Sequence, residues 1–307
     1  MAGATGYIGG GVVHGLRAAG ISVRALTRDA RRFTRVAPGD EMFVGEATSR
    51  AALRGACNGV DAVFSSIGIR TFARRPTLWD VDYQANINLL EEARRAGVRH
   101  FIFVSVIHGP LMAETSPLAK AREMVARAVI DSGIPYTIYR PTGFFNDMAE
   151  FLQAAEKRNS VRLLGSGEGL INPLSAIDMG HEVARAILSG PGRGTERSVG
   201  GPETFTHRQV AELAFRILDK PEKIQAVPRI VLRSAAAMLR PFHANAHGLA
   251  TFFDFIACTP DMRGEPIGRI RLGPFLRLCA QGMSLRDAEL SLDRTHASHR
   301  TGGLPQA

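Results

Sequence analysis

The feature that most constrains this chain is a glycine-rich turn close to its start. Residues 3–9 read Gly-Ala-Thr-Gly-Tyr-Ile-Gly, and an amphipathic stretch over residues 7–19 follows and stops at Gly20. A backbone that wraps a diphosphate must approach it closely, which glycine permits, and the N–H groups of the next helix then point at the anion. With a strand expected at residues 22–27, this order of elements predicts a dinucleotide-binding unit of the Rossmann type.

One element of that unit is short. Only Met1 and Ala2 precede the turn, where a Rossmann fold has a buried apolar strand. Either the natural start lies upstream of Met1, which we favour, or the chain has a truncated first strand. Without that strand, hydrogen-bonding groups of two neighbouring strands would be unpaired, at about 1–3 kcal/mol for each buried group.

Strand-like and helix-like runs alternate through the first 200 residues, which is the pattern of a parallel sheet covered by helices. Residues 99–105 are almost continuously apolar, as a strand buried on both faces requires. Further strands are expected at residues 41–44, 61–66, 136–140 and 195–200, and helices at 77–96, 117–132, 178–188 and 206–218.

We predict an α/β fold in two parts. A doubly wound parallel sheet forms the dinucleotide-binding domain over residues 1–200, with a substrate-side insertion at about 144–175. A small, mainly helical subdomain over residues 201–292 carries a strand at 224–227 and apolar helices at 229–239 and 247–257, and suits a substrate or an oligomer contact. Residues 293–307 are polar and are expected to form a flexible tail.

Composition limits the partners. The formal net charge is +9, but the arginines are scattered among acids and no nucleic-acid-binding motif accompanies them, so we expect no nucleic-acid partner. No apolar run approaches the roughly 18 residues of a membrane helix, so no stable membrane insertion is expected. The start lacks a signal-peptide pattern, and the three cysteines lack metal-ligand spacing. These features favour a cytoplasmic protein with free thiols and no metal site.

The end of the second expected strand distinguishes between the nicotinamide cofactors. NAD sites usually carry an acid there, which binds the ribose hydroxyls. Here the position holds Arg28, with Arg31 close behind and no acid before Asp29. A guanidinium can bind the 2′-phosphate of NADP(H) through two hydrogen bonds, whereas a carboxylate would repel it. Arg28 therefore predicts NADP(H). The alternative for Arg31 and for Arg32, which follows it, is that they only solvate a helix start.

Together these segments resemble the atypical short-chain dehydrogenase/reductase family, in its NmrA-like, NAD(P)-binding branch. The resemblance is carried by GATGYIG at 3–9, VRALTRD at 23–29, GVDAVFSSIG at 59–68, NLLEEARRAGVRHFIFVSV at 88–106, YTIYRPTGFF at 136–145, INPLSAIDM at 171–179 and VGGPETFTHRQVAELA at 199–214. Members of that branch include quinone, chlorophyllide and isoflavonoid-type reductases, epimerase relatives and catalytically silent NADP sensors. The resemblance therefore implies a cofactor but not a substrate.

Cofactor contacts implied by this resemblance fall on the glycine turn and on the ends of successive strands. They are Gly3, Thr5, Gly6, Tyr7, Ile8, Arg28, Glu46, Ser65, Ile67, Lys120, Arg140, Pro141, Thr142 and Gly143. At Glu46 and Ala47 the sequence departs from the family's usual aspartate and hydrophobic residue beside the adenine.

The catalytic pattern of the family is incomplete here. Short-chain reductases typically protonate the substrate with a tyrosine activated by a lysine four residues later, and orient the carbonyl with a serine. Ser105 and Lys120 stand at the serine and lysine positions, but Ser116 replaces the tyrosine. Lys120 is the only lysine in the first 150 residues, which favours a functional role over a solvated helix position. The missing acid could be His108, Tyr83 or Lys120 itself.

Three functions remain open at this level. We predict an NADPH-dependent reductase that passes hydride to a carbonyl, enone or quinone-like carbon of a small apolar substrate, with a homodimer as one assembly. Phe144, Phe145 and Asn146 are expected to line its substrate pocket, with core packing as the alternative for the two phenylalanines. A non-catalytic NADP(H)-binding regulator or assembly factor is the first alternative, favoured by the missing tyrosine. A nucleotide-sugar epimerase relative is the second, and Ser116 argues against it.

Overall fold

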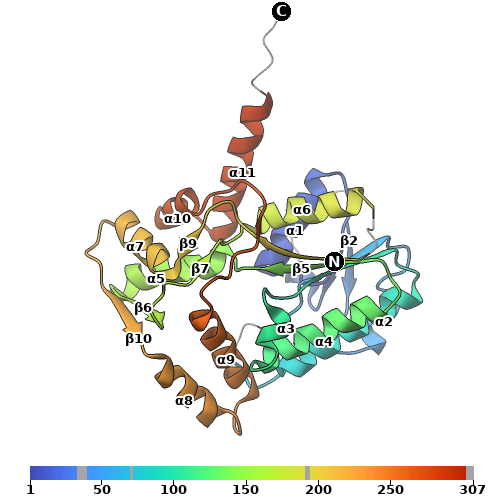
Figure 1. Ribbon diagram of the computed structural model, residues 1–307. Coiled ribbons are helices and arrows are strands. Elements are labelled where there is room, and N and C mark those ends of the chain that lie inside the picture. The colour runs from blue at the N-terminus through green and yellow to red at the C-terminus, as the bar shows by residue number, and fades with distance from the viewer. Residues whose placement is uncertain (33–39, 70–71, 191–193, 302–307) are drawn as a thin grey trace, which may run out of the picture.

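Parallel strands lie on both sides of the N-terminus in the computed structural model, which describes residues 1–32, 40–69, 72–190 and 194–301. On one side β1 pairs with β2, and on the other the order is β3, β4, β5, β8 and β11 (Figure 1). The bounds are β1 Arg24–Thr27, β2 Glu41–Val44, β3 Ala62–Ser65, β4 His100–Val104, β5 Tyr136–Pro141, β8 Thr195–Gly200 and β11 Glu265–Pro266. Every pair is parallel, which confirms the predicted α/β sheet.

Ala2 takes the place of a first strand. Its N–H donates to the Phe64 carbonyl at 2.8 Å, its carbonyl accepts from the Ser66 N–H at 3.2 Å, and the Met1 carbonyl accepts from the Leu26 N–H at 2.9 Å. Ala2 thus bridges β1 and β3 in parallel, so the expected truncated strand is a two-residue link. Connections leave Ala2 in both directions, so the glycine turn starts at the topological switch point, where open α/β sheets bind ligands.

Helices cover both faces of the sheet (Figure 1). On one face lie α1 Tyr7–Ala18 and α6 Ala176–Leu188, and on the other lie α2 Ala85–Arg95 and α4 Pro117–Asp131. β4 shows the reason: Phe101 and Phe103 pack with α2 and α4, whereas Ile102 and Val104 pack with α1 and α6. All five residues of β4 are buried, as the apolar run predicted.

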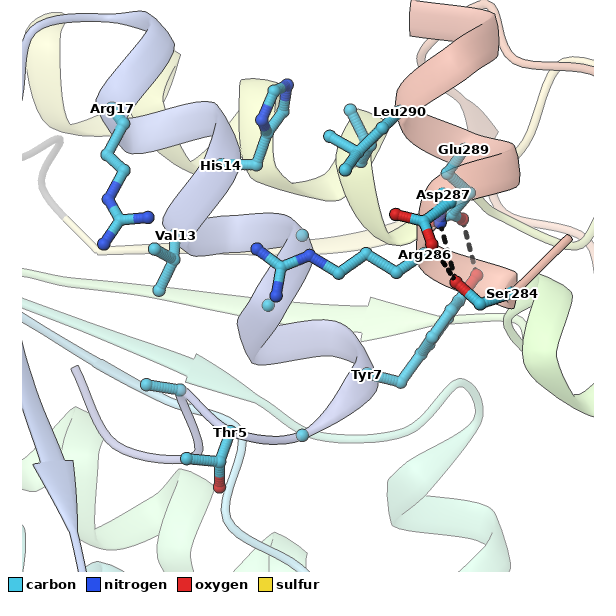
Figure 2. A pocket seen from close by; sticks show the side chains of 15 residues that line it. Thr5, Tyr7, Val13, His14, Arg17, Ser284, Arg286, Asp287, Glu289 and Leu290 are labelled. Carbon is cyan, nitrogen blue, oxygen red and sulfur yellow. Dashed lines mark hydrogen bonds between the residues drawn. The ribbon is translucent and has the colours of Figure 1, made fainter. Parts of the chain in front are cut away.

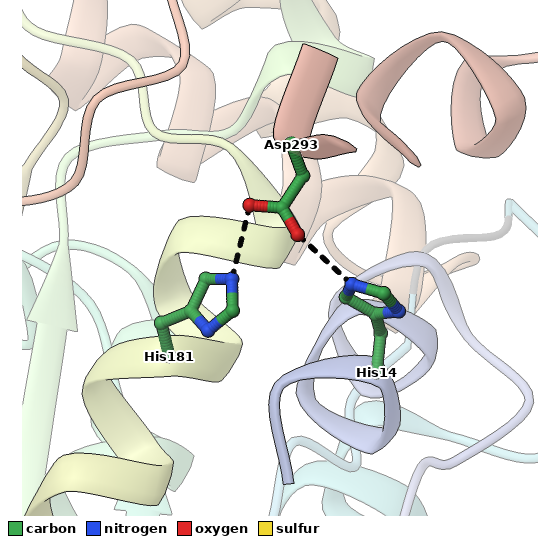
Figure 3. Close-up of side chains that lie close together, drawn as sticks. All are labelled: His14, His181 and Asp293. Carbon is green, nitrogen blue, oxygen red and sulfur yellow. Dashed lines mark hydrogen bonds and ion pairs between the residues drawn. The ribbon is translucent and has the colours of Figure 1, made fainter. Parts of the chain in front are cut away.

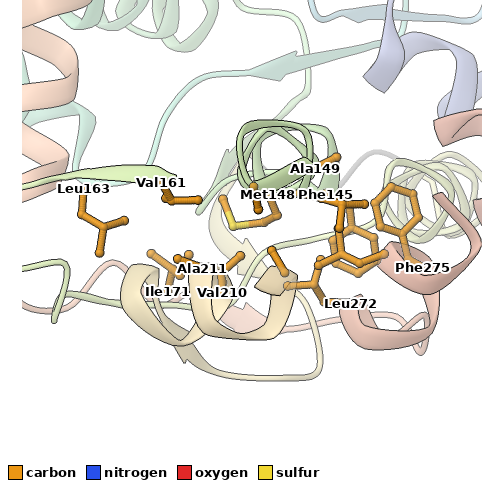
Figure 4. Close-up of a cluster of buried hydrophobic side chains, with 14 of the residues drawn as sticks. Phe145, Met148, Ala149, Val161, Leu163, Ile171, Val210, Ala211, Leu272 and Phe275 are labelled. Atoms are coloured by element: carbon orange, nitrogen blue, oxygen red, sulfur yellow. The ribbon is translucent and has the colours of Figure 1, made fainter. Parts of the chain in front are cut away.

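A second hydrophobic core joins two stretches that are distant in sequence. α5 Phe145–Arg158 packs against α7 His207–Ile217 and α10 Leu272–Ala280, around the side chains drawn in Figure 4. β6 Val161–Leu164 pairs in parallel with β10 Ile224–Val227. The predicted insertion and the predicted C-terminal subdomain therefore share one core.

The C-terminal segment differs from the expectation of a frayed tail at residues 293–307. α11 Leu285–Thr301 continues the helix through residues 293–301, because its inner side packs on α1 and α6. Residues 302–307 lie outside the described part of the chain. The remaining elements are α3 Gly109–Met112, α8 Arg229–Leu239, α9 Ala244–Cys258, β7 Leu170–Ile171, β9 Phe205–Thr206 and the short helices Ala30–Arg32, Ala51–Leu53 and Trp79–Gln84.

None of the described helices is both long enough and apolar enough to span a membrane.

α1 and α6 cross with their backbones in contact, because glycines face each other. A Cβ on Gly11 would lie 2.2 Å from the Ala176 carbonyl oxygen, and a Cβ on Gly15 would lie 2.2 Å from the carbonyl carbon of Gly180. Protein interiors are close-packed, so these positions have no room for a methyl group. The crossing fixes α1, and with it the glycine turn, against α6.

We expect Gly15→Ala to lower the free energy of unfolding by about 1–3 kcal/mol, since the new methyl group overpacks the crossing. Gly10→Ala is the matched control: a Cβ there meets nothing within 4 Å. In that variant the better helix propensity of alanine should raise the stability by about 0.5–1 kcal/mol. Urea unfolding of both variants measures the difference, and equal effects of the two would contradict the packing argument.

Candidate functional site

The glycine turn has the backbone that a diphosphate requires. Gly3 has φ of +88°, and a Cβ on Gly9 would lie 2.0 Å from the Gly3 carbonyl oxygen. Gly6 is the N-cap of α1, where no side chain caps the helix and no acid lies in the first turn. The N–H groups of that turn are therefore open to an anion. Thr5 and Gly6 are exposed, and Tyr7 and Ile8 are half-buried. The residues present fit a diphosphate.

Arg28 and Glu46 follow β1 and β2 at the same edge of the sheet. The Arg28 side chain is 62% exposed, and its Nη1 lies 3.9 Å from Glu46 Oε2. Two ions this exposed contribute little to stability. The guanidinium is therefore accessible to a ligand phosphate, and the predicted roles of both residues stay predictions.

Ser65, at the end of β3, supports the neighbouring loop from inside. The side chain is buried, and its Oγ donates to Asn86 Oδ1 at 2.6 Å. The same oxygen accepts from the Ile67 N–H at 3.4 Å, while Asn86 Nδ2 donates to the Asp82 carbonyl at 2.9 Å. Ser65 thus shapes the backbone around Ile67, which is half-buried.

Ser105 and Arg140 belong to a buried polar network. Ser105 is 1% exposed and its Oγ donates to Glu123 Oε1 at 2.8 Å. Arg140 Nη2 donates to Glu123 Oε2 at 2.9 Å and to Glu196 Oε2 at 2.7 Å. Buried charges require such partners. The Ser105 hydroxyl proton and one edge of the guanidinium are therefore already used within the protein.

Lys120 faces solvent in the first turn of α4. Its side chain is exposed, and its ammonium has no hydrogen bond or ion pair with the described residues. Ser116, at the position of the missing tyrosine, is instead the buried N-cap of α4. Its Oγ also donates to the Gly248 carbonyl on α9 at 3.4 Å. A buried helix cap explains why this position holds a small hydroxyl and not a phenol.

His108 is exposed at the start of α3 and contacts the C-terminal part of the chain. Its Nε2 lies 2.9 Å from the Asp261 carbonyl oxygen, so this nitrogen donates. In the neutral ring Nδ1 is then an acceptor. Tyr83 is half-buried and packs edge-on against Trp79, with ring centroids 6.1 Å apart. The one N–H of the neutral His108 ring is therefore engaged and Tyr83 is half-buried, whereas the Lys120 ammonium is exposed.

The backbone after β5 is held in place. The Thr142 N–H donates to the Val199 carbonyl at 3.1 Å, and the Leu174 N–H donates to the Gly143 carbonyl at 2.9 Å. Gly143 has φ of +143°, and Pro141 is buried. This strand end is rigid, as a contact surface for a cofactor requires, and its cofactor contact stays a prediction.

Phe144 and Phe145 are core residues in the structure. Phe144 joins the cluster under α1 and α6, and the Phe145 ring lies 5.0 Å from the Phe275 ring in the second core (Figure 4). This burial favours the packing alternative over the predicted substrate wall. Asn146 Nδ2 donates to Asp147 Oδ1 at 3.2 Å, while its Oδ1 is buried with no partner in the described chain.

α11 brings a second set of residues to the glycine turn. Tyr7 Oη donates to Glu289 Oε1 at 2.5 Å, and the same oxygen accepts from the Ala176 N–H at 2.9 Å. Beside this contact lies a cavity of about 400 Å³. Figure 2 shows the Arg286 side chain reaching from α11 toward α1 in this cavity. Its wall includes Thr5, Gly6, Tyr7, Gly10, His14, Arg17, Ser284, Arg286 and Asp287.

Asp293 fastens the next turn of α11 to both helices beneath it (Figure 3). His14 Nε2 lies 3.0 Å from Asp293 Oδ2, and His181 Nε2 lies 3.1 Å from Asp293 Oδ1. Arg269 Nη2 is 3.2 Å from Oδ1. These donors hold the pKa of Asp293 well below its usual range. Because a guanidinium already neutralises the carboxylate, we interpret the cluster as a clamp and not as a metal centre.

Sequence reasoning missed the residues that α11 supplies. Glu289 and Asp293 are about 280 residues from Tyr7 and His14, and their separation in sequence carries no sign of contact. The one available signal was helical spacing, since Glu289 and Asp293 are four residues apart and so share a helix face.

Comparison with known proteins identifies the family of the chain. The profile of a family described as NAD(P)H-binding matches residues 3–165. The chain belongs to this NAD(P)H-binding family. In Streptomyces griseus, (4-alkanoyl-5-oxo-2,5-dihydrofuran-3-yl)methyl phosphate reductase is 32% identical over 241 residues, which are 76% of this chain and 79% of that protein.

Other relatives of this NAD(P)H-binding chain carry different names. Divinyl chlorophyllide a 8-vinyl-reductase of Cucumis sativus is 27% identical over 78% of this chain, which spans 61% of that protein's length. A photosystem II assembly factor of Trieres chinensis is 24% identical over 75% of this chain and 72% of its own. The fold matches an Escherichia coli NADPH-dependent quinone oxidoreductase structure with a TM-score of 0.70, at 21% identity over 91% of this chain and 98% of that one.

Substitutions of the two acids of α11 should differ in how their effect on stability depends on pH. Burial raises the pKa of Glu289 to about 7, above its value of about 4.3 in an unfolded chain. The folded state therefore binds the Glu289 proton more tightly than the unfolded state does. The contribution of this proton to the free energy of unfolding is lost as pH rises through about 7. We expect Glu289→Gln to change stability little at about pH 5 and to raise it by on the order of 1–3 kcal/mol at about pH 8.

Asp293→Asn is the matched control for Glu289→Gln. The pKa of Asp293 is depressed, so the stability that this carboxylate contributes is present above its unfolded pKa of about 4 and is lost below it. The variant should lose about 1–3 kcal/mol to a similar extent at both pH values. Denaturant unfolding of the two variants in parallel tests this, and a pH-independent effect of Glu289→Gln would contradict the assigned cause.

Proposed function

We propose that this chain is an NADP(H)-dependent reductase that acts on a carbonyl, enone or quinone-like carbon of a small apolar substrate. The observation that carries the proposal is the arrangement at the carboxyl edge of the sheet. An open glycine turn, an exposed arginine after β1 and an exposed Lys120 on α4 follow strands that Ala2 joins into one parallel sheet. Lys120 has no partner among the described residues. The reductases among its relatives point the same way.

In this proposal different residues of the chain bind different parts of the cofactor. The first-turn N–H groups of α1 would bind the diphosphate, and Arg28 would bind the 2′-phosphate. Lys120 would hold the nicotinamide ribose, and the backbone after β5 would support the ring. When bound, the reduced nicotinamide supplies a hydride, so the reduction needs one further proton from the protein or from water.

Lys120 is the best proton donor that the described site offers. Its ammonium carries protons and is free of partners in the described chain. Ser105 is a poor acid and donates to Glu123, and the neutral His108 ring uses its N–H on the Asp261 carbonyl. Lys120 would therefore deliver the proton directly or through water, and His108 would take part only when protonated.

Arg28→Asp should remove the preference of the protein for NADPH over NADH. Replacing a guanidinium with a carboxylate removes two charge-assisted hydrogen bonds and adds repulsion, so NADPH should bind about 100-fold more weakly or worse while NADH changes little. Calorimetric titration of both cofactors measures this. Arg31→Asp is the control, because Arg31 is 91% exposed and already pairs with Asp29. An unchanged preference in Arg28→Asp would remove Arg28 from the 2′-phosphate site.

Lys120→Met should reduce NADPH oxidation by about 10²-fold or more with any carbonyl, enone or quinone that the wild type accepts, since a positioned acid contributes that much. Lys157→Met, on the exposed last turn of α5, is the control and should retain full activity. Stopped-flow absorbance at the NADPH band follows the reaction. Activity of Lys120→Met within about twofold of wild type would exclude this lysine as the donor.

A non-catalytic NADP(H)-binding regulator or assembly factor is the second candidate. The observation that favours it is that neither serine hydroxyl is available for catalysis. Ser116 caps a helix, and Ser105 is buried and donates to Glu123. The assembly factor among the relatives agrees with it. Tight NADPH binding with no oxidation over a broad carbonyl, enone and quinone panel would favour this candidate over the reductase.

A further inference from the structure

α8 presents an unpartnered face at one extremity of the molecule. The helix packs on α9, where Arg229 Nε lies 3.0 Å from Asp254 Oδ1, and Figure 1 shows it at the edge of the ribbon. Ala236 is its one buried residue, with Leu232 and Leu239 partly buried on the same side. The opposite side of α8 therefore faces solvent.

The outward side chains of α8 are large and apolar. Ile230 is 67% exposed, Val231 56% and Met238 75%, and Phe242 in the turn after the helix is 75% exposed. At 3.6 residues per turn, the three helical residues lie opposite Ala236. Large apolar side chains gathered on one exposed helix face indicate an interaction site.

A neighbouring segment adds two exposed aromatic side chains. Asn245, in the first turn of α9, donates through Nδ2 to the carbonyls of Ala73 at 2.6 Å and Pro76 at 2.9 Å. These bonds hold residues 72–79 beside the turn that joins α8 to α9. Phe72 is 63% exposed and Trp79 is 37% exposed. We refer to Phe72, Trp79, Ile230, Val231, Met238 and Phe242 as the α8 surface.

The charge around the α8 surface is basic. Arg233 is exposed on α8 and Arg240 directly after it, and Arg74 and Arg75 are exposed on the neighbouring segment. Residues 229–243 include no acid. Within the described chain, the one ion pair formed by these four arginines joins Arg75 Nη1 to Asp80 Oδ2 at 3.7 Å. Two copies paired through this surface would bring like charges together. Anionic lipid headgroups would instead attract them.

We propose that the α8 surface docks the protein on a membrane that carries anionic phospholipids. An apolar helix face with arginines at its border and aromatic side chains nearby is typical of helices that lie in the plane of a bilayer interface. The apolar side chains would enter the boundary between headgroups and acyl chains, while the arginines would pair with lipid phosphates. The proposal uses no residue of the cofactor site, so it stands independently of the proposed reductase activity.

Co-sedimentation with sucrose-loaded vesicles tests the docking. The wild type should bind vesicles of phosphatidylcholine with phosphatidylglycerol about tenfold more tightly than phosphatidylcholine alone, and high salt should weaken the difference. Ile230→Ser, Met238→Ser and Phe242→Ser together should cost about tenfold or more in binding, because each side chain is replaced where it meets lipid. Leu188→Ser is the control: Leu188 is 66% exposed at the end of α6, away from the α8 surface.

Trp79 gives a second readout, since it is the chain's one tryptophan. On binding anionic vesicles its emission should shift to shorter wavelength, and lipids brominated in the acyl chain should quench it. Absence of quenching with bound protein would remove residues 72–79 from the docking surface.

Three results would overturn the proposal. One is no sedimentation with phosphatidylglycerol vesicles, and another is equal binding by the triple variant with circular dichroism unchanged. The third is a wild-type dimer by light scattering that the triple variant converts to a monomer, without vesicle binding. In that case the α8 surface is the interface of a homodimer. The substituted side chains are exposed, so none of these outcomes depends on a folding defect.

Discussion

The hydrogen bonds of Met1 and Ala2 join the two halves of the sheet and so position the glycine turn and α1. Through them two residues join β1 to β3 and give the glycine turn a fixed point of departure from the sheet. Because the connections diverge there, the N-terminus of α1 brings uncapped N–H groups to the carboxyl edge of the sheet. The glycines of α1 then let this helix pack with its backbone against α6.

The C-terminal helix completes that arrangement from the opposite end of the chain. Glu289 holds the hydroxyl of Tyr7, a residue of the glycine turn, and Asp293 holds imidazoles of α1 and α6. One of these carboxyls is buried where its charge is disfavoured, and the other is surrounded by donors that favour its charge. The cofactor turn and the last helix are therefore coupled through two acids with opposite electrostatic character.

Within the site, burial separates residues that occupy family positions from residues that are free to act. Ser105 and Arg140 are drawn into a network with Glu123 because buried polar groups must be paired. Arg28 and Lys120 lie outside that network and remain accessible. The motif positions thus predicted which strand or helix carries each of these side chains. Pairing with the neighbouring acids determines which of the side chains can still reach a ligand.

The sequence by itself determined the parallel sheet, the order of its strands and helices, and the glycine turn, because these depend on local periodicity and on backbone freedom at a few glycines. It also placed Arg28 and Lys120, since both follow directly from a strand or a helix start. Only the tertiary structure decided that α11 contacts the turn, that Phe145 is core and that α8 has an uncovered apolar face. Those facts depend on contacts between residues up to about 280 positions apart, and helix or strand periodicity shows which face is apolar but not what covers it.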